Sequence, residues 1–388
     1  MVLQSLKITG LFGLYSYDLQ FRAEDQDSIT FITGPNGYGK TTILSLIHAL
    51  YAYDLDFLMK IPFKVLTVAF NGESGGIVEI TQQRHAEQED NSDVESSSSV
   101  TLGVVFRKLS AKDGTPGEEL DRFEASSENT VEWQERESQL RLYMQALPCY
   151  YIKDQRLQHK AVSLEDGISS EQHATTPAVC DNAQKLQQDL RKLQDHCNKL
   201  FQVRSSVLVN PSEEQKKTDN QSLADKLYRW ELIPTKEILE YDYPLPPVVD
   251  TFVRKLEVFE KIVERSEFAN KQLEISPRFG YRFLAKDENR TILPCEGLSS
   301  GEQHLLILIY ELLFRAEAGS LVLIDEPELS FHLSWQMDFL RNIREIMAAR
   351  DNKIQYIVGT HSPQVFNSEW ERSVDLYKII SGRTENGV

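Results

Sequence analysis

The stretch Gly34-Pro-Asn-Gly-Tyr-Gly-Lys40-Thr41-Thr42 decides the fold of this chain. Before it, residues 28–33 are rich in β-branched side chains, which predicts a strand. After it, residues 43–50 are mostly apolar and predict a helix with a buried face. A strand, a glycine-rich loop and a helix in this order are typical of a loop that binds phosphate.

The residue types of this loop suit a nucleotide and its metal ion. Glycines let backbone N–H groups point inward at a phosphate, and the following helix adds partial positive charge at the same place. Lys40 can reach the β- and γ-phosphates, and the Thr41 hydroxyl can bind Mg²⁺. We therefore expect a nucleoside triphosphate and Mg²⁺ as ligands, and the loop alone does not identify the base. The residues expected to contact the nucleotide are Gly34, Asn36, Gly37, Gly39, Lys40, Thr41 and Thr42.

Three aromatic residues lie in or before this loop. Phe12 or Tyr15 has the flat ring that stacks on an adenine, but packing in the core is the preferred interpretation for both. Tyr38 is a bulky residue for such a loop, and the sequence does not predict its role.

Length, charge and cysteine content restrict the class of protein. The chain has 388 residues, enough for two or three structural units. Its net charge of −17 disfavours a broad surface for polyanions, so nucleic acid is a possible partner that the charge does not indicate. The four cysteines are scattered without a Cys-x-x-Cys pair, which suits the reducing cytoplasm. The longest apolar run, 305–310, is too short to span a membrane, and we expect no signal peptide.

Short alternating or β-branched runs dominate the first third of the chain. The first two predict a β-meander that leads into the strand before the loop, and the next three predict an antiparallel sheet beside it. These runs are 2–8, 17–22, 64–70, 77–82 and 100–108. Polar, acidic segments at 87–99 and 110–130 predict loops, the first of them disordered. Residues 131–147 predict a helix.

From about residue 158 the strand pattern gives way to helical periodicity. Apolar residues recur at spacings of three and four in two runs, as in a short heptad seam. They are Ala183, Leu186, Leu190, Leu193, Cys197 and Leu200 in the first run, and Phe252, Leu256, Phe259 and Val263 in the second. Two heptads do not decide between a projecting coiled-coil arm and a compact helical subdomain, so both stay open. Residues 281–284 and 290–293 then predict a β-hairpin.

Two carboxylates follow an apolar strand pattern near the C-terminus. Residues 321–324 predict a strand buried in a parallel sheet, and ligands of open α/β folds bind at the C-terminal edge of such strands. Asp325 is expected to hold Mg²⁺, and Glu326 is expected to orient or deprotonate the water that attacks the phosphate. A strand end alone would be a weak signal, but the glycine-rich loop upstream strengthens it.

Two further segments have residue types that suit an anion. Ser299-Ser300-Gly301-Glu302-Gln303 opens an apolar helix, where hydroxyls, exposed backbone and the helix dipole suit a phosphate. The same residues equally suit a simple N-cap with a capping box. A predicted strand at 354–358 leads to Thr360-His361. The imidazole of His361 can contact a γ-phosphate, although a lone histidine is more often structural.

These segments occur in the order that ATP-binding cassette ATPases use, and the chain resembles that family at its motifs. The matching residues are Gly34–Thr42 at Walker A, Gln155 at the Q-loop, Leu298–Gln303 at the signature, Leu321–Glu326 at Walker B and His361 at the H-loop. The resemblance implies a head-to-tail homodimer, with each ATP between the Walker A loop of one subunit and Ser300-Gly301 of the other. It implies that Gln155 contacts the metal and that residues near Ser330 cross the interface. Glu326 would be the catalytic carboxylate and His361 the γ-phosphate sensor.

The spacing of the motifs points to one branch of that family. Lys40 and Leu298 are 258 positions apart, more than in transporter subunits, and a helical insertion between two lobes resembles the SMC/RecF/OLD branch. The expected fold is an α/β P-loop ATPase head, with a mixed sheet, flanking helices, an antiparallel β-subdomain and the inserted helical or short coiled-coil subdomain. Its expected parts are an N-lobe at 1–157, the insertion at 158–280 and a C-lobe at 281–388.

The segment after the H-loop bears on the expected activity. The 25 residues after Pro363 are too few for the TOPRIM nuclease domain that OLD nucleases carry there. The chain therefore resembles stand-alone ATPase subunits of bacterial anti-phage systems such as PARIS and Septu, in which the ATPase holds a separate nuclease or toxin effector. This implies an enzyme that converts ATP to ADP and phosphate and serves as sensor and scaffold. A RecF-like DNA-repair ATPase that binds duplex DNA is the alternative.

Overall fold

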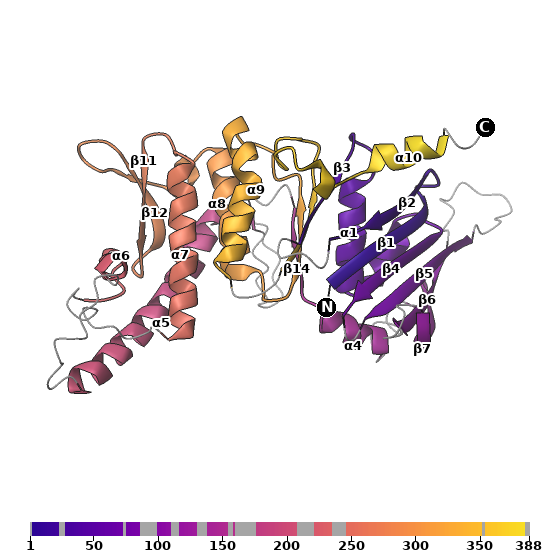
Figure 1. The fold of residues 1–388 in the computed structure, drawn as a ribbon, viewed down its shortest axis with the longest axis horizontal. Coiled ribbons are helices and arrows are strands. Elements are labelled where there is room, and N and C mark those ends of the chain that lie inside the picture. Colours follow the sequence, from indigo (N-terminus) through magenta and orange to yellow (C-terminus); the bar gives the residue numbers. More distant parts are fainter. Residues whose placement is uncertain are drawn as a thin grey trace, which may run out of the picture.

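The chain folds into two lobes on either side of a central sheet (Figure 1). A β-rich lobe holds the N-terminus, and a mainly helical lobe lies on the other side of the sheet. The computed structural model describes residues 2–22, 28–72, 75–85, 99–109, 116–129, 138–153, 158–159, 176–207, 221–234, 246–350 and 354–384. The expected α/β class, with flanking helices, an antiparallel β-subdomain and an inserted helical part, is confirmed.

The central sheet has five parallel strands in the order β16-β3-β15-β14-β8. They are β3 (Ile29–Thr33), β8 (Cys149–Ile152), β14 (Leu321–Asp325), β15 (Gln355–Gly359) and β16 (Ser373–Asp375). Every residue of β3, β14 and β15 is buried, as expected for parallel strands covered on both faces. Helix α1 (Lys40–Tyr51) covers one face, and helices α8 (Ser300–Tyr310) and α9 (Leu333–Ala348) cover the other (Figure 1).

Side chains of β14 alternate between two hydrophobic cores. Leu321 and Leu323 belong to the core that contains α1, whereas Val322 and Ile324 belong to the core that contains α8 and α9. Successive side chains of a strand point to opposite faces, so a continuous apolar run supplies both cores. The structure confirms the strands expected at 28–33, 321–324 and 354–358.

A six-stranded antiparallel sheet forms most of the β-rich lobe, in the order β2-β1-β4-β5-β6-β7. Its strands are β1 (Val2–Leu11), β2 (Tyr15–Gln20), β4 (Val65–Asn71), β5 (Gly76–His85), β6 (Ser99–Leu109) and β7 (Pro116–Ser126). The five strands expected here are confirmed. Strands β1 and β2 pair antiparallel as expected, but the expected continuation of this meander into β3 is wrong. Strand β1 pairs with β4 on its other side, and β3, apolar on both faces, is buried in the parallel sheet instead.

Strand β7 corrects the loop expected at 110–130. Its first half is exposed and acidic, and only Phe123 and Ala125 of this strand are buried. Charged side chains are common on edge strands because they discourage pairing with another chain. The acidic composition that suggested a loop is therefore the composition of a protected edge.

Two short helices accompany this lobe, α2 (Leu55–Lys60) and α4 (Gln139–Gln145). The helix expected at 131–147 is confirmed for the residues of α4. Residues 131–137, and residues 87–98 of the expected acidic loop, lie outside the described part of the chain.

Helices α5 (Ala178–Val207), α6 (Gln221–Arg229) and α7 (Pro247–Arg265) form the described part of the helical insertion. The seam residues of α5 from 183 to 197 are buried, and most of the α7 seam is buried as well. They share one core with α8, so this part of the insertion is a compact layer against the C-terminal motifs. The C-terminal end of α5 points away from the rest of the fold (Figure 1).

A small antiparallel sheet follows, with strands β11 (Lys271–Ser276), β12 (Gly280–Ala285) and β13 (Ile292–Leu293). The expected hairpin is confirmed as the pair β12 and β13. Strand β11 was not expected, because Lys-Gln-Leu-Glu-Ile-Ser has a single β-branched residue. The division of the chain at residues 157 and 280 stays a prediction. The second of these boundaries, residue 280, lies within the hairpin of β11 and β12.

The remaining described elements are short or terminal. They are β9 (Gln158–His159), β10 (Thr176–Pro177), the 3₁₀ turns η4 (Cys295–Gly297) and η6 (Trp370–Arg372), the π-helical turn η5 (Glu311–Arg315) and α10 (Leu376–Thr384). Within the described ranges, no helix combines the length and the apolar character that a membrane crossing requires.

One glycine lets the β11–β12 turn lie directly on helix α5. Gly280 has a φ of +77°, and a Cβ placed there would lie 1.8 Å from the carbonyl oxygen of Ala183. No side chain fits in that distance. Gly280 therefore sets how closely the small sheet approaches the helical insertion.

We predict that Gly280→Ala destabilises the protein by about 3–5 kcal/mol, since the new methyl group adds a backbone clash to a left-handed conformation. Gly319→Ala is the matched control. Gly319 also has a φ of +77°, but a Cβ on this residue would have no neighbour within 4 Å, so the variant should lose only about 1–2 kcal/mol. Urea unfolding followed by circular dichroism measures both. Equal losses in the two variants would show that the contact with Ala183 does not matter.

Candidate nucleotide-binding site

The loop between β3 and α1 has the backbone conformation that its glycines allow. Gly37 and Gly39 have φ angles of 86° and 87°, in the left-handed region that favours glycine. Gly39 is the N-cap residue of α1, and no side chain caps that helix. The first N–H groups of α1 are therefore available to an anion at the mouth of the loop.

Lys40 spans this loop from the first turn of α1. Its side chain is buried, and Nζ donates to the carbonyl oxygens of Gly34 at 2.9 Å and Pro35 at 3.4 Å. Asn36 and Thr41 are exposed, and Thr42 is half-buried. The loop thus holds the residues predicted for the Walker A part of the nucleotide site. The ammonium group of Lys40 lies against the backbone of this loop.

The Walker B carboxylate meets the start of α1. The Thr41 hydroxyl donates to Oδ1 of Asp325 at 3.1 Å, and the hydroxyl of Tyr151 donates to Oδ2 at 3.4 Å. Ser45 lies 3.3 Å from the same tyrosine oxygen. A hydroxyl and a carboxylate beside a phosphate-binding loop are oxygen ligands of the kind that Mg²⁺ prefers. The third predicted ligand, Gln155, lies outside the described residues.

These residues fit a magnesium ion that also takes ligands from phosphate and water. Among the described residues, no group of three His, Cys, Asp or Glu side chains could hold a metal by itself. Magnesium at nucleotide sites is usually held by one or two protein groups together with phosphates. Thr41 and Asp325 supply such a pair.

Glu326 follows the strand in an uncommon conformation. Its φ is +45°, and its N–H donates to the carbonyl oxygen of Gly359 at 2.8 Å. A side chain other than glycine in this region is strained, and such residues concentrate at functional sites. The turn directs the Glu326 carboxylate toward His361, whose Nδ1 lies 3.8 Å from Oε1.

The structure adds one residue that the sequence analysis missed. Glu328 is buried beneath the turn at 360–362, and its Oε1 lies 3.1 Å from Nδ1 of His361. The available signal was the second acid of Glu326-Pro327-Glu328. A buried acid in contact with the ring of His361 is a candidate for a role at the site.

The signature residues lie on a separate element. Ser299 and Glu302 form the capping box at the start of α8, so the structural interpretation of this motif is confirmed. A Cβ on Gly301 would lie 2.4 Å from the carbonyl oxygen of Ser330, so the residue expected near the dimer interface packs on the signature motif. Within the described residues, no hydrogen bond or ion pair joins Ser300 or Gly301 to the P-loop.

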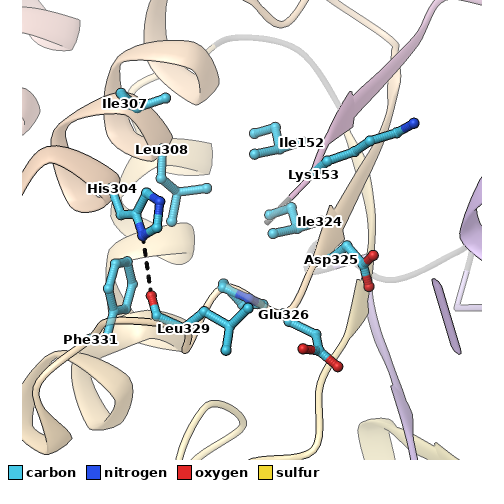
Figure 2. Close-up of a pocket in the computed structure, with 11 residues that line it drawn as sticks. Ile152, Lys153, His304, Ile307, Leu308, Ile324, Asp325, Glu326, Leu329 and Phe331 are labelled. Carbon is cyan, nitrogen blue, oxygen red and sulfur yellow. Dashed lines mark hydrogen bonds between the residues drawn. The ribbon is translucent and has the colours of Figure 1, made fainter. Parts of the chain in front are cut away.

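A pocket connects Walker B with α8 (Figure 2). Figure 2 shows Ile152 and Ile324 facing Ile307 and Leu308, and the carboxylates of Asp325 and Glu326 on the side away from α8. Its remaining lining residues are Lys153, His304, Pro327, Leu329 and Phe331. The pocket places the end of β8, the Walker B turn and the signature helix around one space.

The chain is similar in sequence to a known protein family and to a curated protein. The AAA ATPase domain family matches residues 1–366. The chain belongs to the AAA ATPase domain family. A retron Ec83 probable ATPase of Escherichia coli is 31% identical over 122 residues, which are 29% of this chain and 21% of that protein. This AAA ATPase thus matches about a fifth of the length of that relative.

Solved structures give weaker matches. The SMC head bound to the C-winged helix domain of ScpA has a TM-score of 0.42 and 13% identity, over 94% of this chain and 91% of that one. The SMC head domain from Thermotoga maritima has a TM-score of 0.38 and 13% identity, over 96% and 92%.

Tyr38 of the AAA ATPase packs in a tyrosine cluster. Its ring lies 5.7 Å from that of Tyr15 and 5.9 Å from that of Tyr377 on α10, and its carbonyl accepts from the Tyr17 hydroxyl at 2.7 Å. Burial raises the pKa of Tyr17, and Tyr15 and Tyr38 raise it further, so this hydroxyl stays a donor. The predicted packing is thus confirmed for Tyr15, which packs against the core of the β-rich lobe. It is wrong for Phe12, whose side chain is 41% exposed.

We predict that Lys40→Ala weakens ATP binding by the AAA ATPase at least about 100-fold, because a charge-assisted contact to phosphate is lost. Lys60→Ala, at the exposed end of α2, is the control and should bind as the wild type does. Isothermal titration calorimetry with ATP and Mg²⁺ measures both. Wild-type affinity in Lys40→Ala would remove Lys40 from the site.

Proposed function

We propose that this protein hydrolyses ATP at a site shared by two copies of the chain. The observation that carries the proposal is the meeting of Lys40, Thr41, Asp325, Glu326 and His361 at one edge of the parallel sheet. Strands β3, β14 and β15 end there, and ligands of open α/β sheets bind at this edge. The AAA ATPase domain match supports nucleotide hydrolysis in general.

Each residue then has a defined task. Lys40 binds the β- and γ-phosphate oxygens, and the N–H groups of the loop surround the phosphates. Thr41 and Asp325 would hold Mg²⁺, which would supply positive charge beside the phosphate oxygens. Glu326 accepts the proton of the attacking water, and His361 donates to the γ-phosphate.

The same geometry leaves the signature motif for a second subunit. Ser300 is exposed at the start of α8, where its hydroxyl and the helix N-terminus suit an anion. The neighbouring Ser299 hydroxyl is already engaged by the capping box. Because Ser300 and Gly301 make no described contact with the P-loop of their own chain, we infer that they complete the site of a partner in a head-to-tail homodimer.

We predict that Glu326→Gln binds ATP and accumulates as a dimer, because the loss of the base slows hydrolysis at least about 100-fold. Phosphate release and analytical ultracentrifugation, with and without ATP, measure the two effects. Glu317→Gln, on an exposed residue outside the site, is the control and should behave as the wild type. Unchanged turnover in Glu326→Gln would remove this residue from the catalytic role.

We further propose that the ATPase acts in the cytoplasm as sensor and scaffold for a separate nuclease or toxin effector in anti-phage defence. The short match to a retron ATPase supports a place among such bacterial ATPases. The net charge of −17 speaks against a general DNA-binding surface. Cys149, Cys180, Cys197 and Cys295, all within the described residues, form no disulfides, in keeping with a reducing compartment.

Purification of the tagged protein from its native host tests the effector. We expect a second protein to co-purify in a defined ratio, and the purified ATPase alone to leave DNA uncut. A complex without a second protein, together with ATP-dependent DNA affinity that falls steeply with salt, would favour the RecF-like alternative.

A further inference from the structure

One buried carboxylate oxygen anchors the whole turn that carries His361. Oε1 of Glu328 accepts from the Thr360 hydroxyl at 2.6 Å, from the N–H of His361 at 2.9 Å and from the N–H of Ser362 at 3.2 Å. Nδ1 of the His361 ring lies 3.1 Å from the same oxygen. Four polar groups from three consecutive residues therefore converge on one atom of a side chain that is only 3% exposed.

The negative charge of Glu328 is more than this turn needs. A neutral amide oxygen would accept from the same hydroxyl and the same two N–H groups. The second oxygen, Oε2, is buried, and no described residue offers it a hydrogen bond. A buried carboxylate with one oxygen unsatisfied is costly, so packing and loop anchoring do not account for a charge at this position.

The imidazole ring is the group that the charge acts on. The ring of His361 is 43% exposed, and the carboxylates of Glu326 and Glu328 are the charged groups that the structure places at its Nδ1, at 3.8 Å and 3.1 Å. The nearer one accepts the Nδ1–H, which turns Nε2 away from both carboxylates. A ring that donates from both nitrogens is cationic, and a carboxylate at Nδ1 is the partner that suits it. It also leaves the Glu326 carboxylate without a competing imidazole partner.

We propose that Glu328 is a positioning residue for ATP hydrolysis and acts through His361. Its carboxylate accepts the Nδ1–H of the protonated ring, which leaves the Nε2–H to donate to the γ-phosphate, and it keeps the ring from pairing with Glu326. The role rests on the proposed function, since His361 must contact the γ-phosphate for its orientation to matter. Glu328 is buried beneath the turn, so it acts through the ring of His361.

Kinetics of Glu328→Gln, alone and combined with His361→Ala, test this role. The amide keeps an acceptor for the turn and removes the charge. We expect kcat to fall about 10- to 100-fold, as for other partners that orient a functional histidine, and KM to stay within about threefold. With His361→Ala already present, Glu328→Gln should change kcat less than about twofold. Independent, multiplying losses in the double variant would overturn the proposal.

Two further variants separate orientation from folding. Glu345→Gln is the control, because Glu345 of α9 also accepts from several cations outside the site, Lys261 and Arg265 of α7 and Arg341 of α9. The kcat of this variant should be that of the wild type. Glu328→Asp keeps the charge but draws it back from the ring. Glu328→Asp should lower kcat in the wild-type background but not when His361→Ala is already present. If Glu328→Gln does not fold, this variant tests the positioning role in its place.

The ring itself gives a measurement that does not need hydrolysis. Histidine selectively labelled with ¹⁵N and ¹³C in the imidazole, with His361 assigned from the His361→Ala variant, reports by NMR which ring nitrogens carry a proton in the absence of ATP. We expect a proton on both nitrogens in the wild type, and loss of the Nδ1 proton in Glu328→Gln, which leaves the neutral Nε2–H form. An unchanged ring signal would overturn the positioning role. If the wild type shows no turnover, the proposed function fails, and this signal alone decides whether Glu328 orients His361.

Discussion

The contact between the Thr41 hydroxyl and the Asp325 carboxylate joins residues that are 284 positions apart, and the site depends on it. It forms because β14 lies between β15 and β8 in a sheet whose neighbouring strands β3 and β15 end at the same edge. Burial of β14 on both faces fixes its register, since its side chains fill two cores in alternation. A shift by one residue would exchange the two cores and turn Asp325 away from α1.

The sequence specifies this centre well because its chemistry needs unusual residues at fixed spacings. Glycines before a lysine have few other uses, and two acids after an apolar strand become informative once that loop is present, so the P-loop and Walker B could be predicted. The capping box of α8 could be predicted from a serine followed three residues later by a glutamate. Which strands pair with each other is harder to predict from the sequence. The meander into β3 was wrong because a strand end does not encode its neighbour, and β3 is buried in the parallel sheet.

Strands β7 and β11 were missed for a related reason. Both contain several charged or polar residues, which lowers their strand signal, and both are stabilised by the partner strand beside them rather than by their own composition. Glu328 was missed because its role exists only after folding. It lies 32 positions from Thr360 in the sequence, and nothing short of the folded turn brings the donors of that segment to its oxygen.

The two halves of the proposed site are anchored in different ways. The half with Lys40, Asp325 and Glu326 is fixed by the parallel sheet, and Glu328 and Gln336 fix the turn beside it, the latter by accepting from Ser362 at 2.8 Å. The signature half is fixed by Glu302, which accepts from Lys271 of β11 at 2.8 Å and from the N–H of Ser299 at 2.7 Å. Strand β11 pairs with β12, whose turn lies on α5 at Gly280. The N-terminus of α8 is therefore held by the sheet on which the helical insertion packs, so the position of Ser300 depends on that insertion as much as on the ATPase core.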